Sequence, residues 1–97
     1  MIRPKYSADV RHVTGEKGYC YVAPLPSRLL SDRDSSSRLT LFEDGRELGP
    51  GHAAHEDIRR IGQGRFSHWG SELYFSTSDN SDPSTNGRHY EVRERRQ

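Results

Sequence analysis

The amino-acid sequence predicts a mainly β fold: a small antiparallel sandwich or open barrel of about seven short strands with one short helix. Three observations support this prediction. Two-residue turn signals, Asp44-Gly45 and Gly70-Ser71, each lie between runs rich in aliphatic or aromatic residues. Further strand-like runs are rich in Val and Tyr and end at proline or glycine. Only residues 52–61 show the apolar spacing of a helix.

Length and composition limit the function classes. A chain of 97 residues that is 30% hydrophobic and 30% charged makes one domain with a small core. Its 15 basic and 14 acidic residues give a net charge of +1, so we expect no nucleic-acid partner. No stretch resembles a signal peptide or reaches transmembrane length, and we therefore expect a cytoplasmic protein without membrane contact.

The apolar residues mark the organisation of the chain. We expect a loose arm at 1–7, a single β-rich domain at 8–92 and a charged tail at 93–97. Within the domain, the serine-rich segment 27–38 is predicted to be a long loop, and residues 79–87 a polar loop.

The first two strands are expected at 9–13 and 18–23, joined by a hairpin loop at 14–18 that contains two glycines. Pro24 then ends the second strand. Cys20 lies inside its apolar run, so we expect a buried, unreactive thiol. As the only cysteine of the chain, it excludes an internal disulfide and a multi-cysteine zinc site.

The second hairpin is predicted from strands at 39–43 and 46–48 around Asp44-Gly45, a pair suited to a type I′ turn. A two-residue loop fixes the register, so Glu43 lies opposite Arg46 and is expected to form a cross-strand ion pair. The core face is expected to carry Leu39, Leu41 and Leu48.

The helix at 52–61 is expected to lie against the sheet. A helix is favoured here by acidic residues near its start, by basic residues near its end and by Gly62 directly after it. Its narrow apolar stripe consists of Ala54, Ile58 and Ile61.

The third hairpin turns at Gly70-Ser71, which fits the first-glycine pattern of a type II′ turn. One face is expected in the core, with Phe66, His68, Leu73 and Phe75. The opposite face would carry Arg65, Ser67, Trp69, Tyr74 and Ser76. A final strand at 89–92 follows the turn Asn86-Gly87.

Trp69 and Tyr74 form the candidate binding surface. Aromatic rings next to polar groups suit a sugar, whose C–H groups pack on the ring while its hydroxyls need polar partners. The expected polar rim consists of Arg65, Ser67, Asp79, Asn80, Asp82 and Asn86. Two alternatives remain open: a second sheet that covers this face and makes Trp69 a core residue, and stacking of nucleobases.

The polar loop has oxygen-bearing side chains at every second residue, as a calcium loop does. Because it lacks a bidentate glutamate, we expect these side chains to bind their own backbone in Asx turns. A zinc-dependent enzyme using His52, His55 and His68 is a weaker alternative, since the chain has no HExxH motif. We expect no catalytic residue, metal or cofactor, and a buried hydrogen-bond partner for His68.

From Leu39 onward, a little over half of the chain resembles a small module of bacterial surface-polysaccharide biosynthesis proteins, found beside glycosyltransferases or methyltransferases. The resemblance rests on Leu41–Gly45, Leu48–Pro50, His55, Ile58, Gly64–Trp69, Tyr74–Pro83 and Thr85–Arg88. It implies a non-catalytic accessory role that recognises a carbohydrate or a glycan-modifying partner. The alternative is an interaction or oligomerisation domain with an exposed aromatic face.

Overall fold

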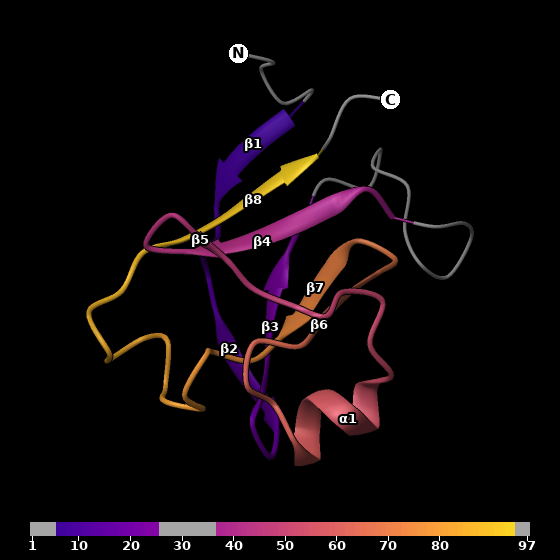
Figure 1. Ribbon diagram of the computed structural model, residues 1–97, viewed down its shortest axis with the longest axis vertical. Helices are drawn as coiled ribbons and strands as arrows, with labels where there is room; N and C mark the ends of the chain where they lie inside the picture. Colours follow the sequence, from indigo (N-terminus) through magenta and orange to yellow (C-terminus); the bar gives the residue numbers. More distant parts are fainter. Residues whose placement is uncertain (1–5, 26–36, 95–97) are drawn as a thin grey trace.

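The computed structural model describes residues 6–25 and 37–94, which form two antiparallel sheets of four strands and one short helix (Figure 1). The elements are β1 (Tyr6–Asp9), β2 (Thr14–Lys17), β3 (Cys20–Pro24), β4 (Leu39–Glu43), β5 (Arg46–Glu47), α1 (His55–Arg60), β6 (Phe66–Trp69), β7 (Glu72–Phe75) and β8 (Tyr90–Glu94). The predicted mainly β fold is therefore confirmed.

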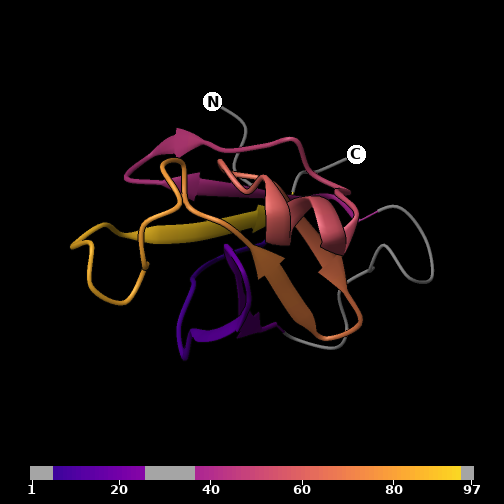
Figure 2. The same cartoon turned by 90° about the horizontal axis from the view of Figure 1, so that it is seen from below.

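The first sheet has the strand order β1-β8-β4-β5 and the second has the order β2-β3-β7-β6. Their inner faces pack on each other and form the hydrophobic core. The first sheet contributes Leu39, Leu41, Tyr90 and Val92, and the second contributes Ala23, Phe66, Leu73 and Phe75. The helix lies outside this sandwich, next to β6 and β7 (Figure 2).

Both predicted two-residue hairpins are present with the predicted register, which pairs Glu43 with Arg46 and Trp69 with Glu72. Asp44 and Gly45 both have positive φ, as a type I′ turn requires. In the other turn, Gly70 has a φ of 63°, whereas Ser71 is not among the residues with positive φ, as in type II′. The two predicted core faces are confirmed as well.

Several strand boundaries differ from the prediction. The strand expected at 9–13 is wrong beyond Asp9, because β1 ends there and β2 begins at Thr14. β1 begins at Tyr6, inside the expected arm, and β8 extends to Glu94, inside the expected tail, because these two strands pair with each other. Such pairing between distant segments leaves no local sequence signal. β2 occupies most of the predicted hairpin loop, and all its residues are exposed, so it lacks the alternation that marks a strand. Most of the predicted loop 27–38 lies outside the described residues.

Helix α1 is shorter than predicted, and it begins after Ala54, which has extended backbone angles. With only six residues it presents one position, Ile58, fully to the sheet. The expected stripe is wrong at Ala54 and Ile61, which are both exposed. Gly62, with a φ of 66°, follows the helix as the predicted left-handed residue. Within residues 6–25 and 37–94, no helix is long and apolar enough to cross a membrane.

Candidate functional site

The outer face of the second sheet carries a cluster of three rings. Helix α1 contacts β3, β6 and β7 on this face. Its first residue, His55, stacks on Tyr74 with ring centroids 4.1 Å apart and planes at 20°. The same imidazole meets Trp69 edge to face, at 5.6 Å and 79°. We call His55, Trp69 and Tyr74 the aromatic cluster.

The aromatic cluster is open at Trp69. This side chain is 43% exposed, while Tyr74 is half-buried beneath the helix. The expected alternative, a second sheet over this face, is wrong because a helix covers Tyr74 and leaves Trp69 at the edge. The Tyr74 hydroxyl donates to Glu72 Oε1 at 3.3 Å, and Glu72 pairs with Trp69 across the hairpin. An indole ring, a phenol and a carboxylate therefore lie together at the end of this hairpin.

An ion pair lies beside the cluster. Arg59 donates to both carboxylate oxygens of Glu16, at 2.9 and 2.6 Å, and so ties α1 to β2. Burial, together with the positive charge of Arg59, lowers the pKa of His55. The imidazole is therefore neutral at pH 7 and stacks on Tyr74 as an uncharged ring. Its Nε2 atom is buried and has no hydrogen-bond partner among the described residues.

Two of the predicted rim residues lie directly before β6 or within it, and they do not form a rim around Trp69. Arg65 donates from Nη1 to the Gly62 carbonyl oxygen at 3.1 Å, which holds the turn after α1. Ser67 lies on the predicted face but is buried, and its hydroxyl has no partner in the described part of the chain. Neither side chain adds a group to the exposed surface of Trp69.

The other four predicted rim residues lie at the opposite end of β7 from Trp69 (Figure 1). Three of them form the expected Asx turns: Asp79 accepts from Ser81 N, Asp82 from Ser84 N and Asn86 from Arg88 N. The fourth, Asn80, accepts from Gln63 N at 2.7 Å and donates to the Ile61 carbonyl oxygen. The structure thus brings Trp69 and Tyr74 together, and it places the loop residues elsewhere.

A buried carboxylate, Glu43, anchors the polar loop to the first sheet. It accepts from the Ser78 hydroxyl and from the Tyr90 hydroxyl, each at 2.6 Å, and Arg88 lies 3.5 Å away. Burial raises the pKa of Glu43, but these hydrogen bonds and Arg88 outweigh it, and the net pKa is lowered. The expected ion pair with Arg46 is wrong, because Glu43 turns to the core side of β4.

His68 and Cys20 are both buried in the interior of the protein. His68 points into the sandwich as predicted, and its Nδ1 lies 2.8 Å from the Ser37 hydroxyl, the expected buried partner. Cys20 is buried, and burial, together with Glu16, raises the pKa of its thiol to about 12. In the part of the chain that the structure describes, no three His, Cys, Asp or Glu residues are grouped to hold a metal ion.

Comparisons with protein-family models, with curated proteins and with solved structures gave no match to this chain. We therefore infer a function from the residues and their geometry. His55 is the member of the aromatic cluster that sequence reasoning missed as a ring partner. The sequence places His55 on the predicted helix, which was expected to lie against the sheet. Its stacking on Tyr74 depends on how that helix packs on β6 and β7, which no local pattern indicates.

Proposed function

We propose that this chain is a non-catalytic accessory module that recognises a carbohydrate, or a partner that modifies one, through Trp69. One observation carries the proposal: Trp69 is 43% exposed, although His55 contacts its ring from within the fold. A large aromatic side chain held in this way loses little conformational freedom when a ligand packs on it. Such a side chain is suited to recognition more than to stability.

The groups around Trp69 suit a sugar. The C–H face of a pyranose packs on an indole, and each hydroxyl can donate and accept hydrogen bonds. The Glu72 carboxylate accepts, and the Tyr74 hydroxyl both donates and accepts, so the two complement the ring. The resemblance to surface-polysaccharide modules points to the same ligand class. A binding site of this kind needs no residue of the polar loop.

Fluorescence tests the proposal directly, because Trp69 is the only tryptophan of the chain. Titration with a panel of oligosaccharides should change its emission and shift the backbone amide resonances of β6 and β7. Trp69→Ala should abolish the resonance shifts without unfolding the protein. Tyr19→Ala is the matched control, since Tyr19 is another large side chain exposed to 43% and lies outside the aromatic cluster. Unchanged binding by Trp69→Ala would refute the proposal.

A second candidate function, a protein-interaction or oligomerisation surface, is favoured by two more exposed apolar side chains. Tyr19 and Ile61 are 43% and 42% exposed, and both lie at the C-terminal end of α1. Sedimentation over a range of concentrations would show association. Loss of association in Trp69→Ala, or in Tyr19→Ala, would identify which end of α1 takes part. Sedimentation as a monomer at all concentrations would exclude the oligomerisation hypothesis.

A further inference from the structure

Glu72 is an exposed carboxylate beside Trp69 that is not paired with any cation in residues 6–25 and 37–94. It lies directly opposite Trp69 in the hairpin, and the Cβ atoms of such pairs are about 4.5–5.5 Å apart. Its side chain accepts one hydrogen bond, from the Tyr74 hydroxyl to Oε1 at 3.3 Å. The Oε2 atom of Glu72 is therefore left as an acceptor next to the exposed indole ring.

The neighbours of Glu72 in the described part of the sheet bring no positive charge. Pro24 lies opposite it on β3, on the side of β7 away from Trp69. His55, which contacts the indole ring, is neutral at pH 7 because its pKa is lowered. The surface around Trp69 therefore carries a local negative charge, although the whole chain has a net charge of +1.

The two arginines of α1 are held by other groups. They lie in the last turn of the helix, whereas His55 contacts Trp69 from its first residue. Arg59 donates to both oxygens of a β2 glutamate, and Arg60 Nη1 lies 3.9 Å from Glu56 Oε2. Neither arginine is thus placed to neutralise the carboxylate beside the indole ring.

We propose that the sugar bound at Trp69 is an amino sugar whose protonated amine pairs with Glu72, an assignment that rests on the carbohydrate recognition proposed for this chain. The C–H face of the sugar packs on the indole ring, and the ammonium donates to the carboxylate. The indole ring also attracts the positive charge through its π face. A uronic acid or a phosphorylated sugar would be repelled by the same carboxylate.

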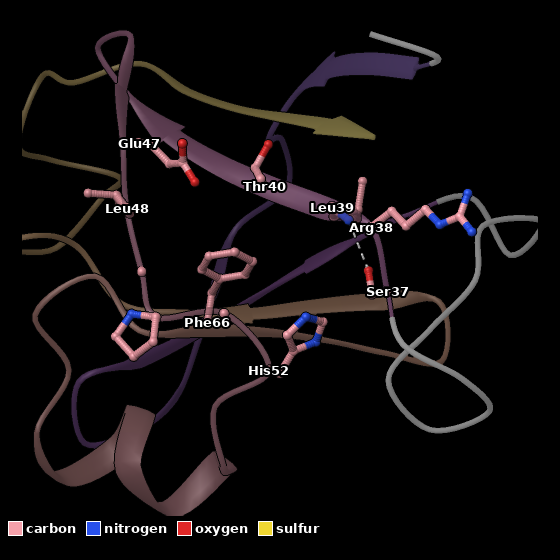
Figure 3. A pocket seen from close by; sticks show the side chains of 11 residues that line it. Ser37, Arg38, Leu39, Thr40, Glu47, Leu48, His52 and Phe66 are labelled. Atoms are coloured by element: carbon pink, nitrogen blue, oxygen red, sulfur yellow. Dashed lines mark hydrogen bonds between the residues drawn. The ribbon is translucent and has the colours of Figure 1, made fainter. Parts of the chain in front are cut away.

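A pocket elsewhere in the fold is less suited to such a ring. It has a volume of about 290 Å³, lies between β4 and the chain that follows β5, and is lined in part by Leu39, Leu48 and Phe66 (Figure 3). Phe66 is only 5% exposed and belongs to the hydrophobic core. A sugar in this pocket would have no exposed aromatic face to pack on, whereas Trp69 offers one.

A matched pair of ligands tests the role of the charge. Oligosaccharides of glucosamine and of N-acetylglucosamine have the same ring, but acetylation of the amine removes its charge. Both series are titrated at about pH 6, where the free amine is protonated, while Trp69 fluorescence and the amide resonances of β6 and β7 are followed. We expect the glucosamine series to bind about three- to tenfold more tightly. Raising the salt concentration to about 1 M should reduce this preference.

Two glutamine substitutions test the carboxylate. Glu72→Gln removes the charge and keeps an oxygen that can accept from Tyr74. The preference for the glucosamine series should then fall to less than about twofold, with little change in binding of the N-acetylated series. The control is Glu47→Gln, because Glu47 is also an exposed glutamate but lies on β5 in the other sheet. It changes the net charge by the same amount and should keep the preference.

Equal binding of the two series by the wild type, or a preference that persists in Glu72→Gln, would overturn the assignment. Binding of choline or lysine as tight as that of the glucosamine series would also overturn it, because the site would then recognise a cation without a sugar ring. In each case the function proposed for Trp69 stands if neutral oligosaccharides still bind and Trp69→Ala abolishes that binding. If no oligosaccharide of either series binds through Trp69, both proposals fail together.

Discussion

Replacing Glu43 should destabilise the fold more than replacing an exposed glutamate. Its carboxylate is nearly buried and accepts two short hydrogen bonds, from Ser78 and Tyr90, with a third from Ser78 N at 3.3 Å. Hydrogen bonds to a charged group contribute about 1.5–3 kcal/mol each. Glu43→Ala removes all three and leaves the buried Tyr90 hydroxyl without this acceptor, so we expect a loss of about 3–5 kcal/mol.

Glu43→Gln should cost less, about 1–2 kcal/mol, because one amide oxygen still accepts from Tyr90. Urea unfolding at pH 7, followed by circular dichroism, measures both losses. The control is Glu56→Gln on the exposed side of α1, expected within about 0.5 kcal/mol of wild type. A loss below about 1 kcal/mol for Glu43→Ala would refute the reasoning, since it would mean that these bonds contribute little.

The same carboxylate predicts a dependence on pH. The pKa of Glu43 is lowered below its ordinary value of 4.5 in the folded protein. Near pH 4.5 and below, the unfolded chain therefore binds more protons at this residue than the folded protein does. The stabilisation is therefore present above about pH 4.5 and is lost as the pH falls through the lowered value. Between about pH 5 and pH 3 the wild type should lose stability more steeply than Glu43→Gln. Parallel curves would contradict this assignment.

Three further changes test other parts of the fold. In Gly62→Ala the new methyl group would meet the Asn80 side chain, whereas in Gly70→Ala, at a similar positive φ, it would meet nothing within 4 Å. Thermal unfolding should therefore show Gly62→Ala less stable than Gly70→Ala by about 1–3 kcal/mol. Cys20 should react with iodoacetamide at pH 8 only as the protein unfolds, and rapid labelling of the native state would contradict its burial. Ser37→Ala should cost about 1–3 kcal/mol by removing the hydroxyl at His68 Nδ1, measured by urea unfolding.

The parts of the fold that depend on local chemistry could be predicted from the sequence. Asp44-Gly45 and Gly70-Ser71 are short turns whose backbone angles only a few residues adopt, and each turn fixes the register of its hairpin. The inward and outward faces follow from that register, as does the burial of His68. The Asx turns of the polar loop were also predictable, since each involves residues two positions apart.

The parts of the fold that depend on contacts between distant residues could not be predicted from the sequence. β1 and β8 meet across nearly the whole chain, and neither carries a pattern that names its partner. Alternation along β4 could have placed Glu43 on the core side, two residues after Leu41, but only the folded structure supplies Ser78 and Tyr90 as its partners. The pocket lined by Leu39, Leu48 and Phe66 joins segments that are far apart in the sequence, so no local pattern indicates it.

The position of β8 has a consequence for the order in which the fold can form. The sheet β2-β3-β7-β6 uses only residues that precede β8, so it can assemble before the last strand is synthesised. In the other sheet β8 lies between β1 and β4, which do not pair with each other. During synthesis the edge of β4 that pairs with β8 therefore has no strand partner until β8 arrives, and closing contacts of such long range slows folding. This interval is when the chain is most exposed to misassembly.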